Sequence, residues 1–593
     1  MFNDLISLIQ SDENIRLAYR NIKRNKGSKT AGVDGKTIDD LKKWNDEKLI
    51  GHIQKSIEWY IPNKIRRVDI PKGNGKTRPL GIPTIRDRLI QQCFLQVLEP
   101  ILEAKFHERS NGFRPNRSAE NAIAQAMTMI QQRGMYYVVD IDIKGFFDNV
   151  SHGKLLKQMW DLGIREKKLL SIISAMLKAE VAGIGYPEKG TAQGGIISPL
   201  LSNVVLNELD WWIASQWEEM PTRHTYKCNI HSNGSVNKNP IYTALRRTEL
   251  KECYIVRYAD DFKIFCRNRS DAIKLFEATK QWLKQRLGLD ISEEKSKIVN
   301  LKRHYSEFLG FKLKAKPKGK TSKGETKYIV TSHITDKASN KILCRAKETI
   351  DNISHHSNNE TKYKYIGLYN AFVMGVHQYY NIATEVNKDF HKISFQVNRT
   401  LKQKLKKELK HIKCTKLRCK AILKIYGKSK ELRCIGNLPI VPIGYVQHKN
   451  PMWKKATVNK YTVEGRNEIH KSLQNIDMNI LLYIMRNPIQ NQSIEYNDNR
   501  IALYSAQMGK CAVTGKHLEY NEIHCHHKTP KYMGGKDDYS NLVILNITIH
   551  KLIHSTRVET VERLLKLLNL TEKQVEKVNQ LRALCELNPI IQI

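Results

Sequence analysis

The stretch RYADDF, residues 257–262, decides the fold, because it sets two adjacent acids between two apolar runs. The flanking segments 254–257 and 262–266 are rich in β-branched and aromatic residues, which is typical of strands. A tight Ala-Asp-Asp turn joins them. The sequence therefore predicts a hairpin with Asp260 and Asp261 at its tip.

A second acidic stretch, VDIDIKGFFD at residues 139–148, lies upstream. Asp142 stands where the apolar segment 136–143 gives way to a glycine-containing turn, so it should follow another strand. If these strands are neighbours, Asp142, Asp260 and Asp261 meet at one sheet edge. Shared carboxylates can hold two divalent cations about 3.5–4 Å apart, which stabilise both oxygens of an in-line displacement. Because Mg²⁺ prefers oxygen ligands, the acids predict a nucleotidyl-transfer site with two Mg²⁺ ions.

An isolated Asp-Asp pair is more often a solvated turn, so the prediction depends on the surrounding motifs. In chain order these are IPKGNGKTRPLGIPTIRDRLIQQ (70–92), SNGFRPNRSAENAI (110–123), GTAQGGIISPLLSNVVLNELD (190–210), LDISEEKSKIV (289–299) and EFLGFKLK (307–314). With the two acidic stretches between them, this succession resembles the sequence blocks of bacterial group II intron reverse transcriptases. NKGSKTAGVDG (25–35) is similar to their additional amino-terminal block. The resemblance extends over nearly the whole chain.

The resemblance implies a multidomain α+β fold: a right-hand polymerase with fingers and palm, a helical thumb, and a small ββα-metal nuclease domain. By position, Asp142, Asp260 and Asp261 are the catalytic metal ligands, and Asp140 should support them. Phe147 is placed under the sugar of the incoming nucleotide, where its ring would exclude a 2′-hydroxyl. The alternative is a core aromatic.

Other residues of these blocks are expected to contact the incoming nucleotide. Lys72 and Arg78 should grip its triphosphate, since a guanidinium can bind phosphate oxygens in pairs; solvated loop residues are the alternative. Gln193 and Gly194 should lie close to the template–nucleotide pair, because glycine has no Cβ to clash. Lys295 is expected to contact a phosphate.

The chain carries a large excess of positive charge. Lysine and arginine total 99 against 59 acidic residues among 593, a formal net charge of +40. Such a surplus repels itself unless an anion binds it, so a nucleic acid is expected as partner; scattered surface lysines are the alternative. The basic segment 399–430, expected to be helical, has lysines on nearly every face, which favours a long anionic ligand.

The same segment, with PIVPIGYVQHKNPM at 439–452, resembles the maturase region of the family. The resemblance implies binding of the group II intron RNA, recognised by shape, and assistance with splicing. Target double-stranded DNA and dNTPs are the other expected partners. No membrane partner is expected, since no stretch approaches about 18 apolar residues. Whether the chain forms a homodimer stays open.

The eleven cysteines form no regular framework, and no signal peptide is recognisable at the start of the sequence. These features predict a reduced, intracellular setting, and the family resemblance implies the bacterial cytoplasm, in association with the nucleoid.

Composition and motifs divide the chain into six expected regions. They are an amino-terminal extension (1–60), fingers and palm (61–315), a charged Gly/Pro-bearing linker (316–327), a thumb and maturase domain (328–452), a DNA-binding region (453–495) and an endonuclease domain with terminal helices (496–593).

Histidines are concentrated near the carboxyl terminus. His550 and His554 are four residues apart, so they share one face of a helix, as two ligands of one metal must. The segment 509–554 resembles the HNH nuclease motif. By that match His526, His550 and His554 bind one divalent metal of unassigned identity, His527 is the general base, and Asn541 braces its loop. The alternative is a His-rich surface turn.

Together these features predict a group II intron-encoded protein that is a reverse transcriptase, a maturase and an HNH endonuclease. The intron RNA would invade one DNA strand, the HNH module would nick the other, and the palm would extend the freed 3′ end. The alternatives are a splicing-only maturase that acts as an RNA chaperone, and a non-intron reverse transcriptase.

Overall fold

The computed structural model describes residues 2–71, 77–231, 236–320, 322, 324–356, 358–411, 419–455, 457–470 and 476–590. The chain divides into two compact units, each assembled from separated segments. The first contains Met1–Lys105, Phe147–Val205 and Thr457–Ile593, and the second contains Phe106–Phe146 and Leu206–Ala456. The consecutive regions expected from the sequence do not coincide with these units, because the segment 61–315 contributes to both.

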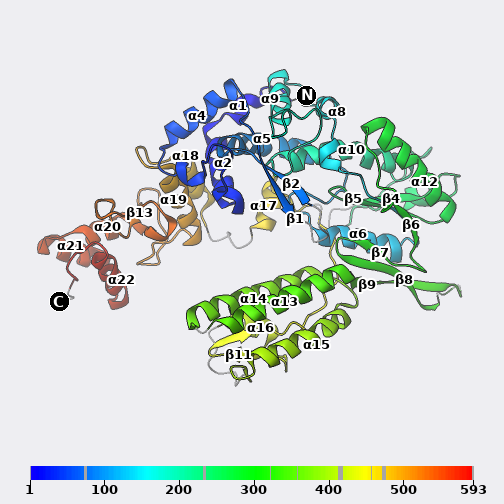
Figure 1. Ribbon diagram of the computed structural model, residues 1–593. Helices are drawn as coiled ribbons and strands as arrows, with labels where there is room; N and C mark the ends of the chain where they lie inside the picture. Colours follow the sequence, from blue (N-terminus) through cyan, green and yellow to red (C-terminus); the bar gives the residue numbers. More distant parts are fainter. Residues whose placement is uncertain are drawn as a thin grey trace. The chain divides into compact units, whose positions relative to one another are not determined.

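A four-stranded antiparallel sheet forms the centre of the second unit. Its strands are β3 (Tyr137–Ile141), β4 (Cys253–Tyr258), β5 (Asp261–Cys266) and β6 (Lys297–Asn300), in the spatial order β4-β5-β3-β6. The first three are buried almost throughout, which explains their continuous apolar sequences. Helices α6 (Ala119–Gln131) and α12 (Arg269–Trp282) pack against the sheet (Figure 1).

A second sheet of this unit corrects the expected linker at 316–327. Strands β7 (Ser306–Phe308), β8 (Phe311–Lys320) and β9 (Thr326–Ile334) are antiparallel in that order, so most of the expected linker is the β8–β9 hairpin. The hairpin forms because β8 buries Phe311, Leu313 and Ala315 at alternate positions. The lysines and glycine beyond them continue the same ladder outward, as an exposed ribbon.

Three long helices follow the second sheet (Figure 1). Helices α13 (Asp336–His355), α14 (Asn359–Tyr380) and α15 (Val386–Leu405) bury Ile350, Tyr369 and Phe390, and α13 packs on both of the others. The remaining elements of the unit are α11 (Asn239–Leu245), the π-helix η2 (Leu283–Leu287), β10 (Lys410–His411), α16 (Lys420–Tyr426), β11 (Arg433–Ile435) and β12 (Leu438–Ile440).

The expectation that 399–430 is helical was wrong in part. Helix α15 ends at Leu405, Lys410 and His411 pair with β11, and a helix returns only over Lys420–Tyr426. Leu401 and Leu405 are buried in α15, whereas Leu409 is only partly buried, and the backbone of the exposed Lys410 and His411 takes strand hydrogen bonds from β11 in place of helical ones. Residues 412–418 lie outside the described residues.

The amino-terminal part of the first unit consists of helices and a β-hairpin. Its amino-terminal elements are α1 (Leu5–Ile9), α2 (Asp12–Arg24), η1 (Lys26–Lys29), α3 (Ile38–Leu41), α4 (Asp46–Glu58), β1 (Arg66–Pro71), β2 (Thr77–Ile82) and α5 (Ile85–Glu103). Helices α8 (His152–Asp161) and α9 (Lys167–Leu177) follow, while α7 (Phe146–Asn149) and α10 (Ser198–Gln216) each begin or end in the other unit. Helix α2 packs on α4 and α5.

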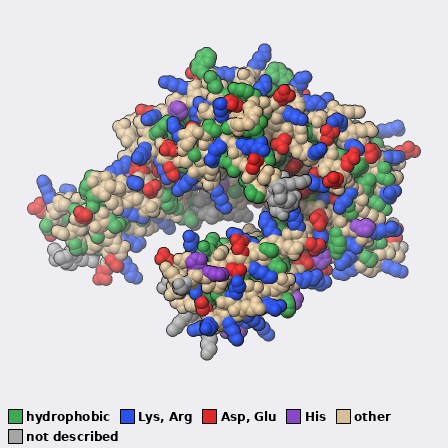
Figure 2. Space-filling view, in the orientation of Figure 1, with side chains coloured by type: hydrophobic (Ala, Val, Ile, Leu, Met, Phe, Trp, Pro, Cys, Tyr) green, Lys and Arg blue, Asp and Glu red, His purple; other side chains and the backbone are tan. Residues whose placement is uncertain are grey.

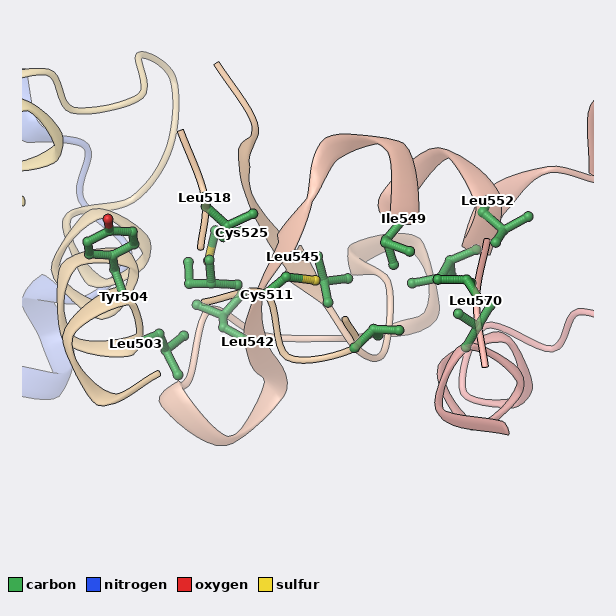
Figure 3. Close-up of a cluster of buried hydrophobic side chains, with 14 of the residues drawn as sticks. Leu503, Tyr504, Cys511, Leu518, Cys525, Leu542, Leu545, Ile549, Leu552 and Leu570 are labelled. Atoms are coloured by element: carbon green, nitrogen blue, oxygen red, sulfur yellow. The ribbon is translucent and has the colours of Figure 1, made fainter. Parts of the chain in front are cut away.

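The carboxyl-terminal part of the first unit has its own apolar cluster. Its elements are α17 (Val463–Ile469), α18 (Met478–Arg486), α19 (Ile494–Ala506), β13 (Ile523–His527), η4 (Lys531–Met533), η5 (Tyr539–Asn541), β14 (Leu542–Asn546), α20 (Ile547–His554), α21 (Val558–Leu568) and α22 (Glu572–Ala583). The hairpin β13–β14 and helix α20 form a ββα unit. Figure 3 shows Leu545, Ile549 and Leu552 in its core.

Lysine and arginine side chains are spread over most elements of the face seen in Figure 2. Among the residues that the structure describes, no helix combines the length and the apolar character needed to cross a bilayer.

Candidate functional site

Three carboxylates meet where β3 and the β4–β5 hairpin end. The register pairs Ile141 of β3 with Phe262 of β5, so Asp142 and Asp261 are the next residues along at the same end of the sheet. The hairpin turn places Asp260 beside them, with Ala259 in the left-handed region at φ 57°. All three acids line one cleft. The convergence predicted from the sequence is confirmed.

The electrostatics of this cleft favour cations. The Asp261 carboxylate opens on the cleft but is otherwise surrounded by protein, and this desolvation is the largest cause that raises its pKa to about 6. The neighbouring acids raise it further, while Lys263 opposes them. Lys295 donates from Nζ to Oδ2 of Asp142 at 3.0 Å. The donor set is therefore hard and oxygen-rich, and the five acids that line the cleft outnumber its three lysines, which fits divalent cations such as Mg²⁺.

Buried ion pairs hold the backbone beneath the acids. Lys263, on β5, donates to Asp140 on β3 and is almost fully buried. Ser306 of β7 donates to the same carboxylate at 3.0 Å, which ties the two sheets together. Arg257 forms a fully buried pair with Asp210 and also donates to the carbonyl of Ala259 at 2.8 Å. The hairpin tip is thus anchored from within the second unit.

The residues of the fingers block that are expected to contact the nucleotide belong to the first unit. Arg78, on β2, donates from Nε to Oε1 of Gln193 at 2.7 Å, and the backbone N–H of Gly81 donates to the Gln193 carbonyl at 2.7 Å. Gly194 has φ 118°, and a Cβ there would lie 2.4 Å from the Gly81 carbonyl oxygen. Its glycine is therefore required by this structure. Lys72 lies outside the described residues.

Phe147 also belongs to the first unit. Its side chain is largely buried, and it lines a pocket together with Leu80, Met176 and Gln193. Phe147 therefore both packs in the core and lines the pocket. Its expected position under a nucleotide sugar stays a prediction.

The histidines of the ββα unit form one cluster. His526 on β13 lies with His550 and His554 of α20, with ring centroids 5.3 Å apart for His526–His550, 5.2 Å for His526–His554 and 4.8 Å for His550–His554. Burial, aided by the neighbouring rings, lowers the pKa of His526 and of His550 to about 3. These imidazoles are therefore neutral at physiological pH, the form in which histidine binds metal.

Two residues of this cluster were missed by sequence reasoning. His524 stacks on His550 at 3.7 Å between ring centroids, and the strand alternation that puts it on the same face as His526 could have found it. Cys585 lies so near that its Sγ and single nitrogens of His526 and His554 are all within 4.8 Å of one another. No signal in the sequence connects it to the histidines.

The structure does not place His527 with these ligands. Adjacent strand residues point to opposite faces, so His527 faces Tyr496 and donates to Asp537, with 2.7 Å between Nε2 and Oδ1. Burial alone would raise the pKa of Asp537, but hydrogen bonds from His527, Ser493 and Lys531 lower it to about 2. Sequence reasoning missed this carboxylate.

Asn541 contacts the loop that follows His527. Its amide accepts from the Thr529 N–H at 2.9 Å and donates to the Thr529 and Lys536 carbonyls at 3.0 and 2.9 Å. These three bonds close the segment 529–541. The contacts expected of a bracing residue are present, and its part in a reaction stays a prediction.

The sheet with three acids at its edge has the arrangement of a polymerase palm. Comparison with known proteins supports this assignment. Residues 70–313 match the family model described as "Reverse transcriptase (RNA-dependent DNA polymerase)". The chain is 33% identical over 326 residues to Protein YkfC of Escherichia coli (strain K12), covering 52% of this chain and 82% of that protein. It therefore contains a reverse transcriptase domain.

A second relative shows the protein family to which the chain belongs. The chain is 30% identical over 429 residues to the group II intron-encoded protein LtrA of Lactococcus lactis subsp. cremoris, covering 63% of this chain and 69% of that protein. It is 27% identical to the putative COX1/OXI3 intron 1 protein of Saccharomyces cerevisiae, over 57% of this chain and 44% of that one. The chain belongs to the group II intron-encoded proteins.

One solved structure, apo telomerase from Candida tropicalis truncated from the C-terminal domain, aligns with 42% of this chain and 53% of that chain. The TM-score is 0.30 at 13% identity, too low to inform the fold or the function.

Proposed function

We propose that this protein is an RNA-directed DNA polymerase that binds its own intron RNA, assists splicing and inserts the intron into DNA by target-primed reverse transcription. The observation that carries the proposal is the convergence of Asp142, Asp260 and Asp261 in one cleft, within a chain of the group II intron-encoded family.

The proposed polymerase reaction uses the second unit's cleft. Asp142, Asp260 and Asp261 would hold two Mg²⁺ ions, which stabilise the attacking and leaving oxygens of nucleotidyl transfer. Lys295 neutralises part of the charge while the ions are absent, and it can turn to a dNTP phosphate when they bind. The anchored hairpin keeps the acids in position without rearrangement, which favours catalysis.

The first unit would supply the fingers. Arg78 is held by Gln193 beside Gly194, where the backbone lies close to Gly81. An arginine held through Nε can turn its two terminal guanidinium nitrogens to a triphosphate. This arrangement supports dNTPs as the substrates of the same reaction.

Binding of the intron RNA would use the basic thumb and maturase region. Helix α15 exposes Lys402 and Lys404 on either side of its buried Leu401 and Leu405, with Lys404 paired to Asp351 of α13 at 2.7 Å, and the β8–β9 hairpin presents further lysines. Exposed lysines of this kind suit the phosphates of structured RNA. The residues from 453 to 495, which include α17 and α18, are proposed to contact target DNA.

The ββα unit is proposed to nick the second DNA strand as an HNH endonuclease. His526, His550 and His554 would hold one divalent metal, and the cluster of neutral imidazoles supports this. His527, oriented by Asp537, would activate water. The reactions require access to intron RNA and DNA together, and a bacterial cytoplasm with its nucleoid is the proposed setting.

The test is primer extension by the purified chain with Mg²⁺, dNTPs, an RNA template and a DNA primer. Wild-type protein should make cDNA, and Asp260→Ala should abolish synthesis while RNA binding persists. Wild-type protein that binds RNA but makes no cDNA would establish a splicing-only maturase instead. Sequencing of the RNA that co-purifies with the protein separates the intron-encoded function from a non-intron reverse transcriptase, since only the former should enrich one structured intron.

A further inference from the structure

Cys585 lies at the carboxyl end of α22, far along the chain from the histidines of the ββα unit. Its side chain is buried, with 3% of the residue exposed. Its Sγ lies within 4.8 Å of a nitrogen of His526 and a nitrogen of His554, and those two nitrogens are equally close to each other. Three donor atoms from β13, α20 and the end of α22 therefore surround one point.

His526 provides an independent indication that this point is built for a ligand. The residue is only 2% exposed, and its Nε2 has no hydrogen-bond partner among the described residues. A buried polar atom without a partner destabilises the fold, because it has lost its hydrogen bonds to water. A metal ion bound there would satisfy this nitrogen.

The position of Cys585 is fixed by a second contact of α22. Arg582, one turn earlier, donates from Nη1 to the carbonyls of Leu552, Ile553 and Ser555 at 3.0, 2.9 and 2.8 Å. These carbonyls lie at the end of α20, where His554 is located. The guanidinium thus caps the histidine-bearing helix and brings the cysteine to it.

We propose that Cys585 is a ligand of the metal in the carboxyl-terminal module, and that the ion is Zn²⁺ or a similarly thiophilic cation rather than Mg²⁺. The inference rests on the proposed metal site among the histidines, and it does not depend on DNA nicking. Thiolate and imidazole ligands select zinc, whereas Mg²⁺ takes oxygen ligands. The ion would fasten the terminal helix α22 to the ββα unit.

Binding requires small movements. Ligand atoms around a tetrahedral zinc lie roughly 3.3–3.6 Å apart, given Zn–N of about 2.0–2.1 Å and Zn–S of about 2.3 Å. The Cys585 thiol, which now contacts the Lys528 carbonyl at 3.6 Å, would lose its proton and this contact. The ring of His550, beside His554, is near enough to take the fourth position after turning from its stack on His524.

The experiment uses the full-length protein loaded with Co²⁺ in place of zinc and follows its absorption spectrum. A thiolate ligand gives an intense near-ultraviolet band from thiolate-to-cobalt charge transfer, which histidine ligands alone do not give. The wild-type protein should show this band at one cobalt per chain, and Zn²⁺ should displace it. Cys585→Ser should remove the band. The same variant should lower the affinity for Zn²⁺ by at least about 10–100-fold, which is the loss usually seen when a residue that only hydrogen-bonds to a metal ligand is replaced.

Cys525→Ala is the matched control, since Cys525 is also a buried cysteine but alternates to the other face of β13 from His526; it should keep the band. A wild-type spectrum without the band, or a band that survives in Cys585→Ser, would overturn the inference. The wild-type spectrum is decisive even if Cys585→Ser does not fold. A charge-transfer band in a protein that does not nick DNA would contradict only the nuclease proposal. Nicking by a protein that lacks the band would contradict only the proposal that Cys585 is a ligand.

Discussion

Lys295 and Asp142 form an ion pair across 3.0 Å at the mouth of the polymerase cleft. Both side chains are largely solvent-exposed, so the pair contributes little to stability. The ammonium instead occupies a position from which it can move to a bound phosphate. This relationship makes Lys295 a residue whose loss should affect substrate binding more than folding.

Lys295→Met should therefore raise the KM for dNTPs in primer extension by about ten- to a hundredfold. This factor corresponds to the free energy of one hydrogen bond to a charged group. The melting temperature should change little. Lys297→Met removes the same charge from the same cleft and serves as the control, because Lys297 lies on β6 and, within the described part of the chain, Asp142 pairs with Lys295 and not with Lys297. Equal KM effects in the two variants would show that only the net charge of the cleft matters.

Asp261 should make the stability of the metal-free protein depend on pH. Its pKa is raised to about 6, so the folded state holds this proton more tightly than the unfolded state does. Below the ordinary carboxyl pKa both states are protonated, and the group has no effect. Between the ordinary carboxyl pKa and about 6, the unfolded state has released the proton while the folded state still holds it, so stability falls across this window and stays lowered above about 6.

Asp261→Asn should accordingly raise the melting temperature in EDTA at pH 7.5 and leave it nearly unchanged at pH 4. Thermal unfolding at the two pH values checks the result. A variant that melts at or below the wild-type temperature at pH 7.5 would contradict the assigned charge repulsion. In primer extension at pH 7.5 the same variant should be inactive, because it lacks a metal ligand.

Gly194→Ala should disrupt the contact between the Gln193–Gly194 turn and β2. The substitution adds a Cβ that would lie 2.4 Å from the Gly81 carbonyl oxygen, at a backbone φ of 118°. The strained backbone alone costs about 1–3 kcal/mol, and the clash adds to it. Primer extension should fall strongly, together with the melting temperature.

Gly183→Ala separates the two causes. Gly183 has φ 80°, but a Cβ there meets nothing within 4 Å, so this variant bears the backbone strain without the clash. It should lose some stability and retain cDNA synthesis. Similar loss of synthesis in both variants would assign the effect to folding rather than to the position of Gln193.

The polymerase centre could be predicted from the sequence because its determinants are local. Apolar runs of strand length identify β3, β4 and β5, and the acids follow directly at their ends. Antiparallel pairing of short neighbouring strands then brings Asp142 to Asp261 without further information. The same local logic applied to His550 and His554, which share a helix face.

The residues that escaped prediction are those whose role depends on long-range packing. Cys585 reaches the histidines only because Arg582 caps α20, and Asp537 meets His527 only because Asn541 closes the intervening loop. Composition misled the expectation at 316–327 for a related reason. Lysine, glycine and proline are typical of linkers, but the ladder between β8 and β9 is formed by backbone groups that every residue except proline can offer.

Asp537 should act as the positioning residue for His527. Asp537→Asn replaces the carboxylate that contacts His527 Nε2 at 2.7 Å with an amide that cannot stabilise an imidazolium. Nicking of double-stranded target DNA should fall about ten- to a hundredfold, part of the roughly 10²–10⁴-fold that a positioned general base contributes. The cDNA yield on a pre-nicked primer should be unchanged, because the polymerase acids lie in the other unit. Asp538→Asn alters the adjacent acid, whose carboxylate lies 3.9 Å from Lys42 Nζ while Asp537 pairs with the base, and should nick at the wild-type rate. Equal losses in both variants, or a loss of cDNA synthesis in Asp537→Asn, would show that the loop acts through folding rather than through His527.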